Sequence, residues 1–110
     1  MYVAMNRFHI RRGQEETFEN IWKQRESRLS GMSGFRSFRL LRGETQDEFT
    51  LFASHTIWDS EASFKAWTKS EAFREAHKNA GDHRNVYLGH PHFEGFREVS
   101  GTAESAEEPA

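Results

Sequence analysis

Three side chains stand apart from those of an ordinary core that packs helices on a sheet: Asn6, Trp67 and His77. His77 follows Phe73 by four residues, so the two share one face of a predicted helix. A neutral imidazole is a common protein ligand of heme iron, and apolar neighbours suit a porphyrin. A histidine on an apolar face is more often a hydrogen-bonded core residue, so the residues alone leave both interpretations open.

Asn6 and Trp67 also have two interpretations each. Asn6 falls in the middle of the more apolar face of a predicted strand, where an unpartnered amide costs about 1–3 kcal/mol. It either bonds to the backbone at a strand irregularity or donates to a ligand between sheet and helices. Trp67 is either a core anchor or a cavity wall. On one straight helix it would point about 80° away from His77, so a helix break is needed for both to face one cavity.

Other kinds of site find little support in the sequence. The chain has no cysteine, which excludes disulfides, iron–sulfur clusters and thiolate ligation. It has no glycine-rich phosphate loop and no nucleophile elbow. The spacing of the remaining histidines is not that of a zinc site, which needs three or four ligands; they are His9, His55, His83, His90 and His92.

The first half of the chain has the pattern of a strand, a helix and then two more strands. Residues 2–10 alternate between apolar and polar side chains, as a strand does. Residues 15–29 have the periodicity of an amphipathic helix whose apolar stripe is interrupted by Arg25. A glycine-containing break follows, and residues 35–42 and 49–56 predict a hairpin.

The second half predicts a broken helix. Asp59 or Ser60 is expected to cap it. Thr68 and Glu71 have the spacing of a capping box, which predicts a kink or break there and a second segment over residues 70–78. The two segments could then turn their apolar faces to the same space.

The remaining elements complete an α+β, ferredoxin-like domain over residues 1–99. Residues 79–91 are predicted as a polar loop and residues 92–99 as the last strand. The order β-α-β-β-α-β indicates a four-stranded antiparallel sheet with helices on one face. The other face also carries apolar residues, and a second subunit would bury them, which predicts a homodimer. Residues 100–110 are predicted to be a disordered acidic tail.

Composition narrows the range of partners. The chain has 15 basic and 17 acidic residues, so it offers no broad basic face for nucleic acid. No apolar run approaches the roughly 18 residues of a membrane span, and no signal-peptide pattern opens the sequence. We therefore expect a cytoplasmic protein without a nucleic-acid or membrane partner. Ten phenylalanines predict a core or pocket lined by flat rings.

Several stretches of the chain carry a family resemblance. They are WDSEASFKAW (residues 58–67), SEAFREAH (residues 70–77) and GFRSFRLLR (residues 34–42). With them, residues 1–99 resemble the IsdG-type heme-degrading monooxygenases of the antibiotic-biosynthesis-monooxygenase (ABM) superfamily. The W-D-S-E-x-x-F-x-x-W portion is shared across that superfamily and does not fix function alone. The combination of Asn6, Trp67 and His77 matches the Asn/Trp/His set of the heme-degrading members.

The resemblance implies a role for each member of that set. His77 would be the proximal ligand of the heme iron, and Asn6 would donate a hydrogen bond on the distal side. Trp67 would press on the porphyrin and help to ruffle it. Further heme-contact residues would be Trp22, Phe73 and Arg25, with Arg25 beside a propionate.

The resemblance also implies a reaction and an assembly. Heme would be both the substrate and the oxygen-activating group, and O2 and an external electron donor, supplied by a reductase, would complete the reaction. Ring opening would release iron and a bilin-type product. Members are homodimers whose sheets form a central α+β barrel. Two other functions stay open: a heme-independent ABM-type oxygenase of aromatic or quinol substrates, and a non-catalytic heme-binding protein.

Overall fold

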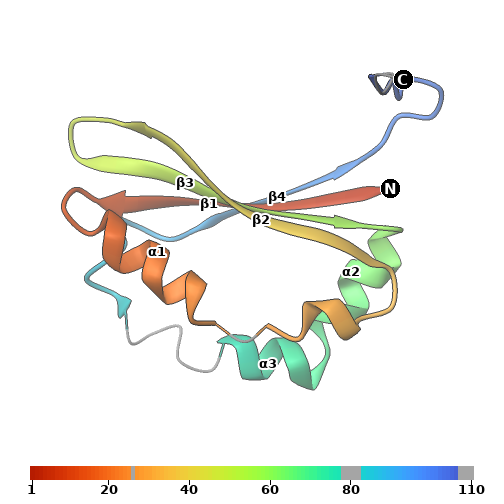
Figure 1. The fold of residues 1–110 in the computed structure, drawn as a ribbon, viewed down its shortest axis with the longest axis horizontal. Helices are drawn as coiled ribbons and strands as arrows, with labels where there is room; N and C mark the ends of the chain where they lie inside the picture. The colour runs from red at the N-terminus through yellow and green to blue at the C-terminus, as the bar shows by residue number, and fades with distance from the viewer. Residues whose placement is uncertain (26, 78–82, 107–110) are drawn as a thin grey trace.

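The helices lie on one face of a four-stranded antiparallel sheet (Figure 1). A computed structural model describes residues 1–25, 27–77 and 83–106. The sheet has the strand order β2-β3-β1-β4. The elements along the chain are β1 (Tyr2–Arg11), α1 (Glu15–Lys23), the 3-10 turn η1 (Leu29–Gly31), β2 (Phe35–Thr45), β3 (Phe49–Trp58), α2 (Glu61–Thr68), α3 (Glu71–His77) and β4 (His92–Arg97). This topology confirms the predicted ferredoxin-like α+β fold.

The central strand β1 alternates as the sequence predicts. Its residues Tyr2, Ala4, Phe8 and Ile10 belong to the buried core under the sheet, each at most 6% exposed. Asn6 has the same phase and therefore lies on the same face of the strand. The period of two thus places one amide among the core side chains that face the helices.

The first helix is shorter than predicted. α1 ends at Lys23, not at residue 29, and the chain continues to Arg28, whose φ of 56° is left-handed. The following 3-10 turn brings Leu29 into the core beside Trp67. Leu29 is apolar and in phase with α1, so its spacing predicts a longer helix. In the structure, the 3-10 turn carries this side chain into the core, and tertiary packing there outweighs the local preference for a longer helix.

The predicted break in the second helix is confirmed. α2 ends at Thr68 and α3 begins at Glu71. Ser60 caps α2, since its Oγ accepts the N–H three residues on, at 3.2 Å. The capping box predicted for α3 is wrong, because Ser70 accepts the N–H of Phe73 at 3.1 Å. The Thr68 hydroxyl donates instead to a carbonyl of α2.

The hairpin strands run beyond their predicted ends, which leaves residues 46–48 as the turn. Gly34, just before β2, has a φ of +83°, and a Cβ there would collide with the Ser63 side chain. Its carbonyl accepts the N–H of Asp59 at 2.7 Å. A glycine is therefore required where β2 starts next to α2.

Residues 86 and 87, which precede β4, contribute to the core. The polar composition of the predicted loop did not indicate this. Val86 is 4% exposed, and Tyr87 packs edge-on against Phe18 with centroids 5.7 Å apart. The N–H of Arg11 donates to the carbonyl of Val86 at 2.9 Å, and an isolated bridge joins Ile10 to Tyr87. This part of the predicted loop is thus an extension of the sheet edge.

Two other predictions fall partly outside the described residues. Residues 79–82 of the predicted loop and 107–110 of the predicted tail lie there. Residues 98–106 are exposed and contain no helix or strand, and the disordered tail stays a prediction. Within the described part of the chain, no helix is long and apolar enough to cross a membrane.

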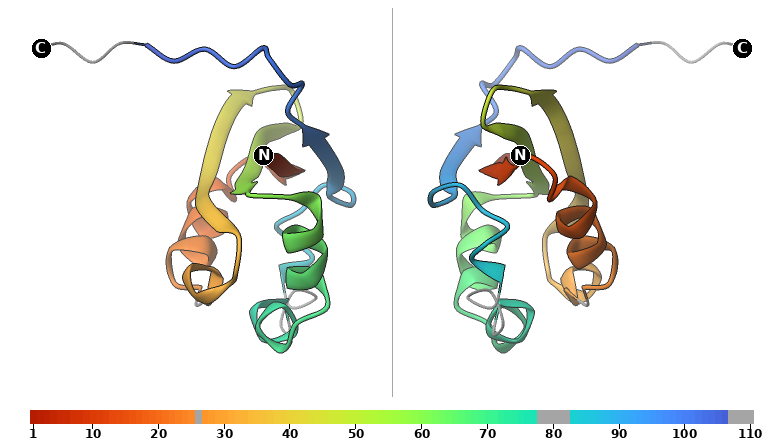
Figure 2. Two further views of the ribbon diagram at one scale, coloured as in Figure 1. Left: turned by 90° about the vertical axis from the view of Figure 1, so that its right-hand side faces the viewer. Right: turned by 90° about the vertical axis from the view of Figure 1, so that its left-hand side faces the viewer.

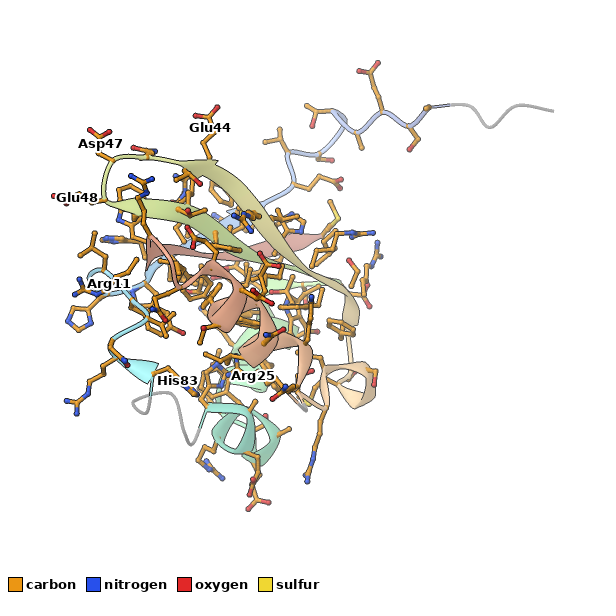
Figure 3. The ribbon with its side chains drawn as sticks, turned by 60° about the vertical axis from the view of Figure 1, so that its left-hand side comes forward. Arg11, Arg25, Glu44, Asp47, Glu48 and His83 are labelled. Atoms are coloured by element: carbon orange, nitrogen blue, oxygen red, sulfur yellow. The ribbon has the colours of Figure 1, made fainter. Side chains whose placement is uncertain are left out.

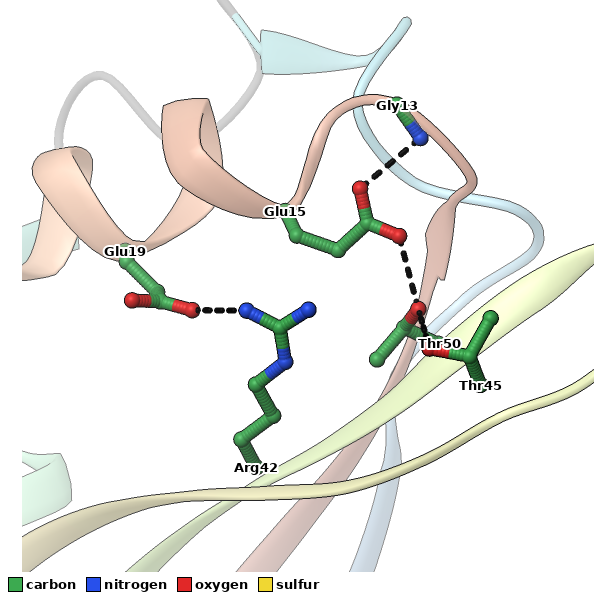
Figure 4. Close-up of polar contacts among 6 residues, drawn as sticks. All are labelled: Gly13, Glu15, Glu19, Arg42, Thr45 and Thr50. Atoms are coloured by element: carbon green, nitrogen blue, oxygen red, sulfur yellow. Dashed lines mark hydrogen bonds and ion pairs between the residues drawn. The ribbon is translucent and has the colours of Figure 1, made fainter.

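A chain of hydrogen bonds joins the start of α1 to the β2–β3 hairpin (Figure 4). The Thr45 hydroxyl donates to that of Thr50 at 2.9 Å, and Thr50 donates to the Glu15 carboxylate at 2.7 Å. The second carboxylate oxygen accepts the N–H of Gly13 at 2.8 Å. Thr50 is fully buried, so its hydroxyl needs these partners. The hydrogen bond from Thr50 is the main cause that lowers the pKa of Glu15.

We expect Glu15→Gln to lower the free energy of unfolding by about 1 kcal/mol at neutral pH, because the charge-assisted hydrogen bonds are lost. A carboxyl whose pKa is lowered by folding stabilises the fold above its unfolded pKa. This contribution disappears as the pH falls through the folded pKa. In urea unfolding, the difference from wild type should therefore shrink below pH 4.5, the ordinary value.

Glu16→Gln is the matched control for this experiment, because Glu16 is the exposed neighbour on the same helical turn. It should leave the free energy of unfolding within about 0.5 kcal/mol of wild type. A loss in Glu15→Gln that is equal at neutral and acidic pH would show that the charge has no part in it.

Candidate functional site

A cavity of about 500 Å³ lies under the sheet, between α1 and the α2–α3 pair. Its volume is within the range of small-molecule sites. Figure 2 shows two helical arms below the sheet, with α1 in one and α2 and α3 in the other. The cavity walls include all six residues that the sequence singled out: Asn6, Trp22, Arg25, Trp67, Phe73 and His77. The fold therefore brings together side chains from β1, α2, α3 and the end of α1.

His77 stands on the last turn of α3, at the exposed rim of the cavity. Its Nδ1 lies 2.8 Å from the Phe73 carbonyl oxygen, and its ring stacks on the Phe73 ring with centroids 4.0 Å apart. A carbonyl can only accept, so Nδ1 carries the proton in this contact and Nε2 keeps a lone pair.

The surroundings of His77 also favour its neutral form. Partial desolvation lowers the pKa of the imidazole, the hydrogen bond to Phe73 raises it, and the positive charge of Arg25 lowers it. The net shift is downward, which favours the neutral form of the ring. Neutral imidazole is the form that binds a metal through nitrogen.

Asn6 lies in the middle of β1, on the wall of the cavity that the sheet forms. Its neighbours in register are Ser54 on β3 and Phe93 on β4. Among the residues that the structure describes, none forms a hydrogen bond with the Asn6 side-chain amide. The interpretation that this amide bonds to backbone at a strand irregularity therefore finds no support within the described residues. The amide remains available to a ligand.

Trp67 is both a core residue and a cavity wall. It is 6% exposed, and its ring packs on Trp58 at 6.4 Å and edge-on against Phe73 at 5.4 Å. It also lines the cavity. With the break between α2 and α3, both Trp67 and His77 line this cavity.

Arg25 and Trp22 form the wall on the α1 side. The guanidinium of Arg25 lies over the Trp22 ring, 4.6 Å from its centroid. Its Nε and Nη2 both donate to the Ala76 carbonyl, at 2.9 and 2.6 Å. Desolvation by burial lowers the pKa of Arg25, which nevertheless stays charged at neutral pH. Trp22 in turn stacks on Phe38, with centroids 5.5 Å apart.

Sequence reasoning missed several cavity residues on the strands. Phe93 is half exposed and stacks on Phe64 with the two planes 6° apart. Ser54 is 5% exposed, and both it and Thr56 border the cavity. The alternation of each strand indicates which of its residues share a face. The neighbours of Asn6 depend on the register between strands, which the alternation does not give.

This set of side chains suits a flat aromatic ligand that carries a metal at its centre. The walls are largely aromatic, and neither Nε2 of His77 nor the side-chain amide of Asn6 has a hydrogen-bond partner among the described residues. Within the described ranges, no three His, Asp or Glu side chains cluster into a metal site of their own. A single imidazole is sufficient when a porphyrin supplies the other ligands of the metal, so the residues present fit heme.

Comparison with known proteins relates the chain to oxygenases. The family described as antibiotic biosynthesis monooxygenase matches residues 1–79. A curated relative from Staphylococcus saprophyticus, named heme oxygenase (staphylobilin-producing), is 32% identical over 78 residues, which are 71% of this chain and 74% of the relative.

Solved structures agree with this relationship. The heme degrader MhuD from Mycobacterium tuberculosis, with two hemes bound in its active site, has a TM-score of 0.68 and is 26% identical, covering 94% of this chain and 100% of MhuD. SnoaB, a cofactor-independent oxygenase from Streptomyces nogalater, has a TM-score of 0.66 at 16% identity, covering 94% of this chain and 98% of SnoaB, which shows the fold alone. The chain therefore belongs to the antibiotic biosynthesis monooxygenase family and is related to its IsdG-type heme-degrading members.

Proposed function

We propose that this protein is a heme-degrading monooxygenase, that is, a heme oxygenase of the IsdG type, which binds heme in the cavity under the sheet. The observation that carries the proposal is His77 at the rim of an aromatic cavity of about 500 Å³, with its Nδ1 bonded to the Phe73 carbonyl and its Nε2 without a partner among the described residues. The heme oxygenase relative and the heme-bound MhuD structure support the same substrate.

His77 is the proposed proximal ligand. The hydrogen bond from Nδ1 to the Phe73 carbonyl fixes the tautomer and the plane of the ring, as hydrogen bonds to the second nitrogen of metal-bound histidines do. Stacking on Phe73 restricts rotation of the imidazole. The ring is therefore held in an orientation that requires little rearrangement when Nε2 binds.

The other walls would position and shape the substrate. Bound heme supplies both the iron at which O2 is activated, with electrons from an external donor such as a reductase, and the ring that is opened to a bilin-type product with release of iron. Asn6 donates an amide N–H to the ligand from the sheet. The buried Trp67 presses on the macrocycle from α2, and Trp22 and Phe73 cover its apolar surface.

The function is tested by titrating the protein with hemin and then adding ascorbate or a reductase in air. We expect a red-shifted Soret band on titration and its replacement by a bilin spectrum on reduction. No spectral change on titration would favour a heme-independent oxygenase. A heme complex that ascorbate and a reductase leave unaltered in air would indicate a non-catalytic heme-binding protein.

Asn6→Ala is expected to leave hemin affinity within about threefold of wild type and to slow aerobic heme loss by about 10- to 100-fold, because a preorganised donor acts on the reacting group. Asn20→Ala, on the exposed surface of α1, is the control and should retain full activity. Single-turnover kinetics with ascorbate measure the effect. A wild-type rate in Asn6→Ala would remove this residue from the mechanism.

We propose that a second copy of the chain covers the free face of the sheet. That face carries Leu41 and Phe96, which are 42% and 47% exposed, and the half-buried Val3 and Met5. A homodimer that forms a barrel from two sheets would bury them. Light scattering that finds only monomer at micromolar concentration would contradict this assembly. The cytoplasmic location stays a prediction.

A further inference from the structure

α3 is a short helix that carries the proposed ligand. It spans seven residues, and none of them is fully buried. Helices of this length are not stable on their own and depend on capping and tertiary contacts. Ser70 caps the first turn, and Phe73 packs on Trp67. What holds the last turn, from which His77 projects, decides where the imidazole lies.

The last turn of α3 is held by Arg25. Two N–H groups of its guanidinium donate to the carbonyl of Ala76, the residue just before His77. Carbonyls in the last turn of a helix lack partners within the helix, and a cation there is favourable for the helix dipole. Figure 3 shows Arg25 in the space between α1 and α3. This contact joins two segments that are 51 positions apart in the sequence.

Arg25 is itself fixed in place. Its guanidinium lies over the ring of Trp22, and burial is the main effect on its pKa. Within the described residues, no carboxylate forms an ion pair with it. The early end of α1 at Lys23 brings Arg25 to this position. Among the described residues, its hydrogen bonds are therefore the two to the Ala76 carbonyl.

We propose that Arg25 is a positioning residue for His77: by bonding the Ala76 carbonyl, its guanidinium fixes the last turn of α3 and so the place at which Nε2 of His77 meets the cavity. The inference rests on the proposed function, since it takes His77 as the heme ligand. It differs from the role that the family resemblance implies, in which Arg25 contacts a propionate directly. The two roles make different predictions.

Hydrogen exchange in the heme-free protein tests the structural part. In Arg25→Ala, the amides of α3 should exchange about tenfold faster, since the last turn opens more often. Arg25→Lys, which can restore one hydrogen bond, should recover part of the protection. Lys23→Ala, an exposed cation at the end of α1, should exchange as wild type does. Unchanged exchange of α3 in Arg25→Ala would overturn the proposal, whatever the protein does with heme.

Binding of hemin and of hemin dimethyl ester tests the link to His77. The ester has no free carboxylate, so a positioning role predicts that Arg25→Ala weakens both ligands equally, by about tenfold. In a His77→Ala background, Arg25→Ala should weaken neither ligand further. Arg25→Met keeps the aliphatic stem and should behave as Arg25→Ala does.

A loss of affinity that is confined to hemin and absent with the ester would show a direct carboxylate contact and overturn the proposal. The same holds if the loss persists in the His77→Ala background. If the wild-type protein bound neither ligand, the proposed function would fail, while the exchange experiment would still decide whether Arg25 holds α3.

Discussion

Alanine at His77 is expected to weaken hemin binding by at least about 100-fold and to remove or strongly shift the Soret band of the ferric complex. Loss of an outer-shell partner of a metal ligand alone costs about 10- to 100-fold in affinity, and here the ligand itself is removed. The remaining cavity walls are mainly aromatic and aliphatic and offer no second nitrogen ligand within the described residues. Titration followed by absorption and resonance Raman spectroscopy measures both effects.

Two further variants make this result specific. In His77→Gly, added imidazole should enter the vacated space and restore the spectrum of a histidine-ligated heme. His83→Ala changes another partly exposed histidine, which does not border the cavity, and should bind hemin as wild type does. Wild-type affinity and turnover in His77→Ala would end the assignment of this residue as the ligand.

Trp67→Ala is expected to lower the free energy of unfolding by about 3–5 kcal/mol, the usual cost of deleting a large aromatic side chain from a core. Trp67 is 6% exposed and packs on Trp58 and Phe73. Domains of this size are stable by about 5–15 kcal/mol, so the variant would lose a large part of its stability. Urea unfolding followed by circular dichroism measures the change.

Trp67→Phe separates the structural role from the catalytic one. It keeps an aromatic ring in the core and should cost about 1 kcal/mol of stability. The smaller ring fills less of the cavity wall, so hemin should still bind while turnover slows. If the free energy of unfolding of Trp67→Ala were within about 1 kcal/mol of the wild-type value, the placement of this residue in the core would be contradicted.

Much of the fold follows from local patterns that the sequence displays. The alternation in β1 and the break between α2 and α3 are properties of neighbouring residues, so both could be predicted. The alternation also predicted that Asn6 lies on the apolar face of its strand. The helix break allowed Trp67 and His77 to face one cavity. The candidate site was therefore recognisable from residue type, local period and family resemblance together.

The rest of the site depends on contacts between distant segments. α1 ends before Leu29, which is buried through a turn, and Arg25 lies just beyond that end, where it bonds the carbonyl of Ala76. The cross-strand pairing of Asn6 with Phe93 depends on the register of β1 and β4. The bridge from Tyr87 to β1 arises in a segment with the composition of a loop. Each of these contacts joins two distant segments, and neither segment alone contains a sequence pattern that predicts it.

The central claim is that this protein opens the heme ring with O2, and mass spectrometry after aerobic turnover in 18O2 tests it most directly. Hemin, the protein and ascorbate or a reductase are incubated under the labelled gas, and iron release is followed with a chelator. We expect an open-chain tetrapyrrole that carries 18O, together with free iron, and far less of both with His77→Ala. Intact heme recovered in full from the wild-type reaction would contradict it.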